Sequence, residues 1–297
     1  MKINGRIHQV ELNTKMIGIR QNKKILFFYF QNSQMNLFKR YLYKGNWIEL
    51  EYDEDRIVTK NKKEAFVVSF IYKLSAIGKF DQVIYYDKGM LNQSLSKFLK
   101  SLGNTLVLDL EMTMPSYTFK GKGFRPEIIQ AGFIVLDGEG EEICRYSNYI
   151  QPTLSGKITK RAEDFLKISS LDFSSRAIRY DQFYEDFKEV LENYHPVILV
   201  FGRNDIIVLN DSYTINDKPS LKNKTRFVNL CQLIKSYYDL RNDPGLFKLY
   251  KIYYDNEDIQ VHDAFNDSEV TAKVFKAFKD EVYQKTNKAE VLRRELD

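Results

Sequence analysis

The chain contains 297 residues, of which 43% are hydrophobic and 29% are charged, so it has the composition of a soluble globular protein with a sizeable buried core. Its length favours two domains over one. No apolar run is long enough to span a membrane, and the first residues lack an apolar leader segment. The only cysteines, Cys144 and Cys231, fit neither a disulfide framework nor a zinc site. We therefore expect a cytoplasmic protein that does not act in a membrane.

The formal net charge of +5 is unevenly distributed along the chain. Residues 1–100 hold 18 Lys and Arg against 9 Asp and Glu, whereas residues 101–297 hold 27 against 31. This distribution suits a polyanionic substrate. The basic N-terminal part would hold it, and the acidic part would process it with metal ions. A lysine-rich surface can equally serve solubility alone, so charge leaves both interpretations open.

Residues 1–88 are predicted to form a small basic β domain. Stretches rich in β-branched and aromatic residues alternate with turn signals, and five or six short strands at this spacing indicate an OB-like barrel. The acidic residues Glu51, Asp53, Glu54 and Asp55 are expected to form a solvated turn. The expected strands are 5–11, 16–20, 25–30, 47–52, 64–72 and 82–86.

The strand expected at 25–30 has a candidate nucleic-acid-binding face. If Phe28 and Phe30 face the barrel core, Phe27 and Tyr29 lie on the other face, close to the lysines that begin the segment KKILFFYF. Outward aromatic rings beside lysines form a stacking platform for single-stranded nucleic acid. A strand buried on both faces explains the same pattern, and the two interpretations carry about equal weight.

A connecting helix is predicted over residues 89–103. Residues 94–102 have apolar side chains at helical spacing, and Gly103 then ends the pattern. We therefore expect a second domain over residues 104–297.

The second domain begins with the stretch 105–113, TLVLDLEMT. This apolar strand ends in Asp109 and Glu111, which share one face because side chains two apart on a strand point the same way. Two neighbouring buried carboxylates repel each other unless a cation neutralises them, and Mg²⁺ binds such oxygens. The pair therefore fits half of a metal site, although an ordinary strand end has the same tripeptide more often.

The loop at 114–126 follows these carboxylates directly. Its basic residues Lys120, Lys122 and Arg125 are placed to steer a phosphate backbone towards them. A disordered surface loop is the alternative. Two strands then follow, at 127–137 and 141–150, joined by a hairpin connection that contains Gly138 and Gly140.

A third carboxylate follows a buried strand. The run PVILVF at 196–201 is apolar throughout, as expected of a strand covered on both faces, and Asp205 comes just after it. Ligands of α/β sheets bind beyond such strand ends. Asp211 is a nearby competitor, but Asp205 follows the strand more closely. Helices are expected at 159–168, 180–194, 230–238 and 246–254.

The last candidate residues open the final helix. An amphipathic pattern starts at Ala264, which places His262 at the helix entry and Asp267 in its first turns. Both side chains can face one point of the sheet. Either residue alone is more often a surface or capping residue, so the evidence lies in the combination.

The order DLEMT, GRNDIIVL and HDAFND resembles the motifs of the DEDD superfamily of 3′–5′ exonucleases, in its histidine-containing branch, over residues 104–284. The segment PEIIQAGFIVLD followed by YIQP is similar to RNA-trimming exonucleases, and DLEMT is also similar to oligoribonuclease. The resemblance implies an α/β, RNase H-like mixed sheet flanked by helices. It implies cleavage of single-stranded nucleic acid, with RNA favoured over DNA.

The resemblance also implies roles for individual residues. His262 would be the general base, since an imidazole can accept a proton at neutral pH, and Asp109 would bridge two metal ions. Met112 and Thr113 would contact the terminal nucleotide. The implied ligands of two Mg²⁺ or Mn²⁺ ions are Asp109, Glu111, Asp205 and Asp267.

Two other functions remain open at this point. A nuclease fold that binds nucleic acid without cutting it is one, and a nuclease restricted to short oligonucleotides is the other. The sequence departs from the family in its long loop at 114–126 and in Ser268, which follows the last aspartate.

Overall fold

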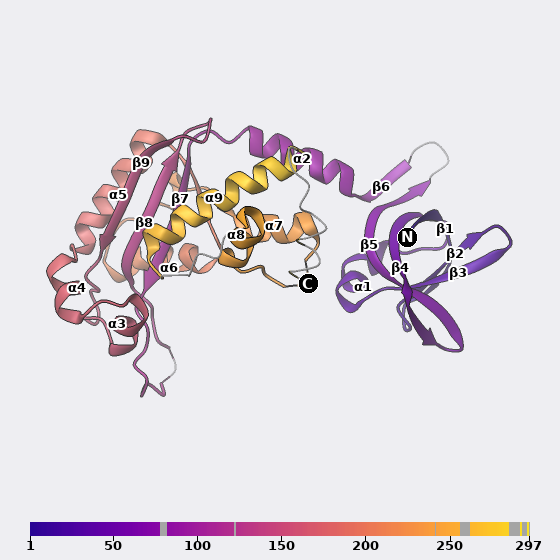
Figure 1. The fold of residues 1–297 in the computed structure, drawn as a ribbon, viewed down its shortest axis with the longest axis horizontal. Helices are drawn as coiled ribbons and strands as arrows, with labels where there is room; N and C mark the ends of the chain where they lie inside the picture. Colours follow the sequence, from indigo (N-terminus) through magenta and orange to yellow (C-terminus); the bar gives the residue numbers. More distant parts are fainter. Residues whose placement is uncertain are drawn as a thin grey trace. The chain divides into compact units, whose positions relative to one another are not determined.

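The computed structural model describes residues 1–77, 82–121, 123–240, 242–255, 262–284, 292 and 296. The chain divides into two compact units, Met1–Lys97 and Phe98–Asp297, each with its own hydrophobic core (Figure 1). Within the described ranges, no helix is both long and apolar enough to cross a membrane.

The first unit is a closed β-barrel. Antiparallel pairing joins its strands in the order β3-β2-β1-β4-β5, and parallel pairing of β3 with β5 closes the ring, while β6 extends the sheet beyond β5. The predicted small barrel is therefore confirmed. The elements are β1 (Lys2–Glu11), β2 (Met16–Gln21), β3 (Lys24–Tyr29), α1 (Asn32–Phe38), the 3₁₀ helix η1 (Lys39–Tyr41), β4 (Trp47–Lys60), β5 (Lys63–Ile77) and β6 (Gln82–Asp87).

Strand β3 has one fully buried ring with a half-buried ring on either side of it. Phe28 is fully buried in the barrel core, whereas Phe27 and Tyr29 are half-buried on the opposite face. The Lys63 ammonium lies 4.7 Å from the centre of the Phe27 ring. Gly18 of β2 leaves room for this ring, because a Cβ there would lie 3.2 Å from it.

The predicted acidic turn is wrong. Glu51, Asp53 and Glu54 lie within β4, which continues to Lys60 and pairs with β5 through a register shift after Asp53. The turn falls later, at residues 61–62, where both backbones are left-handed. Helix α1 was not predicted, because its seven residues carry only two buried apolar side chains.

The second unit is built on a mixed five-stranded sheet with the order β11-β10-β7-β8-β9. Strands β10 and β11 run parallel to β7, whereas β8 and β9 are antiparallel neighbours. The predicted α/β fold is confirmed. The strands are β7 (Thr105–Met112), β8 (Ile128–Leu136), β9 (Glu142–Tyr149), β10 (Val197–Val200) and β11 (Phe227–Asn229).

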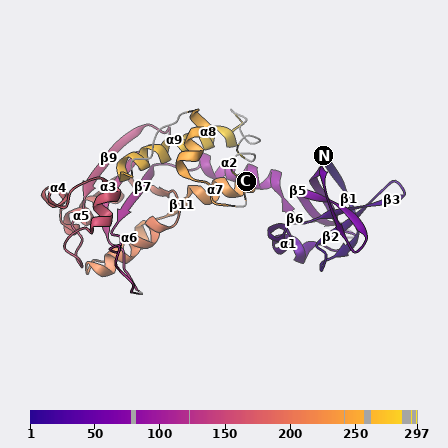
Figure 2. The ribbon, with the colours of Figure 1, turned by 60° about the horizontal axis from the view of Figure 1, so that its bottom comes forward.

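Helices cover both faces of this sheet (Figures 1 and 2). Apolar residues of α5 and α6 pack against the β7 face that carries Leu106, Leu108 and Leu110, and α9 packs against β7 and β8 on the face that carries Asp109. The helices are α3 (Lys160–Leu166), α4 (Ser170–Arg176), α5 (Tyr180–Tyr194), α6 (Asn204–Ile215), the 3₁₀ helix η2 (Lys222–Lys224), α7 (Leu230–Tyr238), α8 (Leu246–Tyr254) and α9 (Ala264–Val282), with α2 (Lys88–Lys100) crossing the boundary between the units.

Candidate active site

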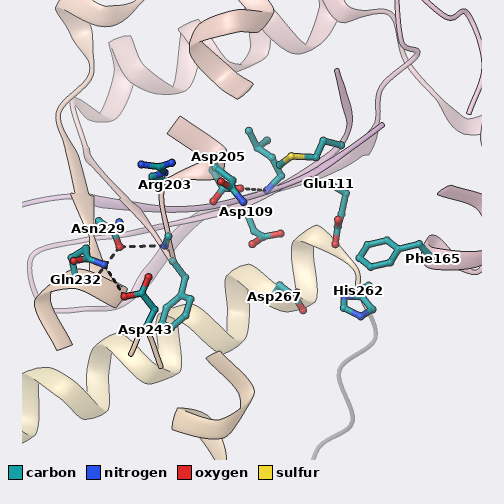
Figure 3. Close-up of a pocket in the computed structure, with 15 residues that line it drawn as sticks. Asp109, Glu111, Phe165, Arg203, Asp205, Asn229, Gln232, Asp243, His262 and Asp267 are labelled. Carbon is teal, nitrogen blue, oxygen red and sulfur yellow. Dashed lines mark hydrogen bonds between the residues drawn. The ribbon is translucent and has the colours of Figure 1, made fainter. Parts of the chain in front are cut away.

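A cavity of about 770 Å³ opens at the end of β7 in the second unit (Figure 3). All five residues that the motifs single out line it, although they come from three separate parts of the chain. They are Asp109, Glu111, Asp205, His262 and Asp267.

The register of β7 and β8 places the first two carboxylates. Asp109 pairs opposite Gly132 and Glu111 opposite Gln130, so both carboxylates lie on the face covered by α9. The start of α9 can approach only because residue 132 is glycine. A Cβ there would lie 2.2 Å from the backbone nitrogen of Phe265.

Asp205 enters the cavity from the first turn of α6. Its Oδ1 accepts a hydrogen bond of 3.1 Å from the backbone N–H of Leu110, which fixes the carboxylate beside β7. Gly202, with a φ of +117°, makes the sharp turn between β10 and this helix. The competing residue Asp211 is exposed on α6 and is not among the residues that line the cavity.

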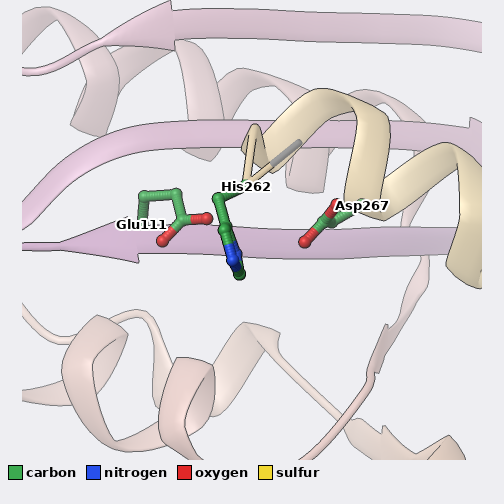
Figure 4. A group of neighbouring side chains, drawn as sticks. All are labelled: Glu111, His262 and Asp267. Carbon is green, nitrogen blue, oxygen red and sulfur yellow. The ribbon is translucent and has the colours of Figure 1, made fainter. Parts of the chain in front are cut away.

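His262 and Asp267 flank the start of α9. One ligand atom from each of Glu111, His262 and Asp267 lies within 4.8 Å of the others (Figure 4). The His262 ring stacks on Phe165 of α3 at a centroid distance of 4.1 Å. The helix entry is thus held close to the carboxylates of β7.

Gln130 of β8 anchors this helix entry to the sheet. Its Nε2 donates to Asp263 Oδ2 at 2.6 Å, and its Oε1 accepts from the backbone N–H of Ala264 at 3.3 Å. Asp263 is the N-cap of α9, since its Oδ1 accepts from the N–H of Asn266. Gln130 is buried and holds the residue next to His262.

Burial and mutual repulsion raise the pKa values of these carboxyl groups. Burial, then the charges of Asp267 and Asp205, raise the pKa of Glu111 to about 8. Burial, then the neighbouring carboxylates, likewise raise the pKa of Asp109 well above its usual range. Burial raises the pKa of Asp205 as well, although the bond from Leu110 opposes the shift. The cluster is therefore unfavourable when ionised without a cation.

The donor set fits divalent cations. Oxygen ligands from carboxylates are those that Mg²⁺ and Mn²⁺ prefer. Among the residues that the structure describes, none donates a hydrogen bond to the side chain of Asp109 or Glu111. These two anions face the cavity, and no donor within that described set offsets their charge.

The cavity wall across from the carboxylates of β7 is also polar, and the sequence did not indicate its residues. Asn229 caps α7 and accepts from Gly202 N–H, and Gln232 donates to Asp243 (Figure 3). Arg203 lines the cavity, and it has no carboxylate partner within the described part of the chain. Only its position beside Asp205 in the second motif marks it in the sequence.

The predicted substrate contacts are distributed over several places. Met112 lines the cavity, whereas the Thr113 N–H is already bonded to the Glu127 carbonyl at 2.8 Å. Lys120 is exposed and Arg125 lines a second cavity. Lys122 lies outside the described residues, and Phe27 and Tyr29 belong to the first unit.

The second unit is similar to known exonucleases. The family model RNase_T: Exonuclease matches residues 106–275. The Probable 3′-5′ exonuclease KapD of Bacillus subtilis (strain 168) is 31% identical over 172 residues, which are 58% of this chain and 82% of KapD.

Solved structures share the fold at low identity. The structure of 3′-end specific recognition of histone mRNA stem-loop by 3′-exonuclease matches with a TM-score of 0.53 and 14% identity, over 66% of this chain and 81% of that one. The nuclease domain of 3′hExo, a DEDDh family member bound to rAMP, matches with a TM-score of 0.50 and 17% identity, over 61% of this chain and 94% of that domain.

Proposed function

The chain belongs to the RNase_T exonuclease family, and from this premise we propose that it is a metal-dependent 3′–5′ exonuclease that releases nucleotides from single-stranded nucleic acid, RNA in preference to DNA. The resemblance drawn from the motifs is thereby confirmed at the level of the family. The observation that carries the proposal is the convergence of four carboxylates and one histidine on a single cavity. The name of KapD supports the 3′–5′ direction.

We assign the metal ions to the four carboxylates. Asp109 and Glu111 come from β7, Asp205 from α6 and Asp267 from α9, so the sheet and two helices hold the ligands in a fixed arrangement. Two divalent ions bound there would activate water and stabilise the departing 3′ oxygen. Asp109, partly buried beside Asp205 and Glu111, would hold the ions together with these two carboxylates.

His262 is assigned as the general base. Its ring borders the carboxylate cluster, and stacking on Phe165 limits its rotation. An imidazole held at this point can take the proton from a water that attacks the phosphorus atom. Gln130, through Asp263, holds the backbone next to this histidine.

The barrel of the first unit is assigned to hold the strand, as an OB-like domain over residues 1–88. The segment 12–48 contains seven Lys and Arg and no Asp or Glu. Among described residues, none of these seven cations has a carboxylate partner, so their field is available to a polyanion. Half-buried Phe27 and Tyr29 lie on the strand that begins at Lys24 and remain the assigned stacking residues.

The preference for RNA rests on the segment similar to RNA-trimming exonucleases. Two structures with this fold support it, since one shows recognition of a histone mRNA stem-loop and the other was solved bound to rAMP. Sugar preference depends on contacts to the 2′-hydroxyl, so it requires a direct comparison of RNA and DNA.

One experiment tests polarity, metal dependence and sugar preference together. RNA and DNA strands labelled at the 5′ end or the 3′ end are incubated with Mg²⁺, with Mn²⁺ and with chelator. We expect 3′-labelled strands to release labelled mononucleotide at once, 5′-labelled strands to shorten progressively, RNA to react faster, and chelator to stop both reactions.

Matched variants connect the activity to the cavity. Asp109→Asn and His262→Ala should lower nucleotide release at least about a hundredfold. Asp211→Asn, an exposed carboxylate on the same helix as Asp205, should leave it unchanged. Undiminished release by both cavity variants would overturn the assignment, and strand binding without any product would identify a silent nuclease fold.

A further inference from the structure

A second cavity of about 450 Å³ lies beyond the end of β7, and we call it the loop cavity. One wall is formed by residues within 113–119 and 123–127, and the other by residues within 154–159. Its lining includes Thr113, Phe119, Phe124, Arg125, Leu154 and Lys157. The three motifs DLEMT, GRNDIIVL and HDAFND contribute only Thr113 to this lining.

The walls of the loop cavity are anchored at their bases. The backbones of Thr113 and Glu127 are joined by a bond of 2.8 Å, and Thr113 Oγ1 accepts from Glu127 N–H. Thr159 donates to the Met114 carbonyl. The two ends of the long loop are therefore joined by hydrogen bonds, and Thr159 connects the second wall to the first.

Glu127 fixes the second wall, and its charge is offset by the bonds it accepts. Its carboxylate is buried and accepts backbone N–H bonds from Thr153, Leu154 and Ser155. Among the described residues, no other carboxylate lines the loop cavity. This acidic group is therefore already satisfied and does not oppose an anionic ligand.

The rest of the lining combines exposed apolar groups with cations. Phe119 and Phe124 are 45% and 38% exposed and pack edge to face at 5.9 Å, while Leu154 is 60% exposed. Arg125 and Lys157 have no carboxylate partner among the residues described. Aromatic faces beside unpaired cations match a nucleobase and its phosphate, and they match neither a cationic nor a purely apolar ligand.

The loop cavity adjoins the candidate active site along the chain. Met112 lines the active-site cavity and the next residue, Thr113, lines the loop cavity. An exonuclease that removes the 3′-terminal nucleotide holds this nucleotide at the metal ligands. Any further bound nucleotide must therefore lie on the 5′ side of the bond that is cut.

We propose that the loop cavity binds a nucleotide of the single strand upstream of the bond that is cut, with its base against Phe119 and Phe124 and its phosphate near Arg125 and Lys157. This inference rests on the proposed function, because it takes the polarity of the strand from it. The two nucleotides that flank the cut bond are assigned to the larger active-site cavity, so the nucleotide in the loop cavity lies further upstream. A dinucleotide lacks this nucleotide, and the cavity therefore makes the enzyme sensitive to substrate length.

The test measures the kinetics of three proteins on substrates of two lengths. The KM and kcat for a dinucleotide and an octanucleotide, each as RNA and as DNA, are measured for the unmodified protein, for F119A/F124A and for F98A. Phe98 is a matched control, because it is also 38% exposed in the second unit but lines neither cavity. Because Phe119 and Phe124 are exposed, their truncation leaves the core intact.

We expect F119A/F124A to raise the KM for the octanucleotide about tenfold, as the loss of one base stack does, with kcat unchanged. The dinucleotide kinetics and both kinetics of F98A should stay unchanged. An unchanged octanucleotide KM would overturn the proposal. An equal loss on the dinucleotide would also overturn it, because the loop would then act at the metal site.

A binding measurement separates this proposal from the proposed function. The octanucleotide is given a 5′ fluorophore and a methylphosphonate at its last linkage, so that its affinity can be measured without hydrolysis. F119A/F124A should weaken its binding about tenfold, and Arg125→Ala should weaken it as well. If no protein releases nucleotides but this loss of affinity is seen, the exonuclease proposal fails and the loop cavity stands as a nucleotide site.

Discussion

Replacing Glu111 by Gln should stabilise the metal-free protein at high pH while it abolishes nucleotide release. Burial and the charges of Asp267 and Asp205 raise the pKa of Glu111 from 4.5 to about 8. The folded state therefore binds a proton that the unfolded state has lost, and stability falls as pH rises between these two values. A glutamine side chain has the same shape as the glutamate and carries no charge, so the variant escapes this loss.

The magnitude follows from the difference between the two pKa values. One pH unit corresponds to about 1.4 kcal/mol, so ionising Glu111 in the metal-free fold costs at most about 5 kcal/mol at pH 9 and less than about 1 kcal/mol at pH 5. Glu111 is only 9% exposed, so solvent screens little of this cost. For a unit of this size the melting temperature should shift by at most about 10 to 20 °C at pH 9.

The assay is thermal unfolding in chelator at pH 5 and pH 9, followed by circular dichroism. Trp47, the one tryptophan of the chain, lies in β4 of the first unit, so its fluorescence reports the barrel and serves as an internal reference. Saturating Mg²⁺ should stabilise the unmodified protein more than Glu111→Gln, since the variant has lost a ligand. A variant that is less stable than the unmodified protein at pH 9, or a difference that is the same at both pH values, would refute the reasoning.

Substitutions at three further positions, Gly132, Gln130 and Arg203, test the surroundings of the site. Gly132→Ala should destabilise the second unit by about 3 kcal/mol, because its Cβ meets the backbone of α9, and thermal unfolding measures this; an unchanged melting temperature would contradict the packing. Gln130→Ala removes the bond to Asp263 and should lower kcat about tenfold with little change in KM. Gln130→Glu places a carboxylate against that of Asp263 and should lose at least as much activity; full activity in either variant would count against a positioning role. Arg203→Ala should raise KM severalfold with kcat retained, because the unpaired guanidinium lines the cavity where it can contact a substrate phosphate. The control Arg179→Ala loses only an exposed ion pair with Asp181, so it should leave KM unchanged.

The parts of the second unit that follow a regular pattern could be predicted from the sequence. The alternation in TLVLDLEMT predicts β7 and places Asp109 and Glu111 on one face, as the register with β8 shows. The stripe of Phe183, Phe187 and Leu191 predicts α5 with its observed ends. These features are local, because the period of the pattern alone determines which side chains are buried.

Features that depend on contacts between distant segments could not be predicted. Gln130 and Asp263 are 133 residues apart, and nothing in either segment indicates their hydrogen bond. Phe165 has the spacing of an ordinary core residue of α3, yet its ring stacks on His262. Strand β11 has only three half-buried residues, which is too short for any periodic pattern.

Strand β8 supplies no carboxylate to the active site, yet its register determines the site. Opposite Asp109 it carries Gly132, which lets α9 approach, and opposite Glu111 it carries Gln130, which holds the entry of the same helix. A slip of one residue would turn both β8 residues to the other face, against α5 and α6. The two carboxylates of β7 and the two site residues at the start of α9 are therefore brought together by the pairing of two strands, and substitutions on β8 should affect the metal ligands and the histidine together.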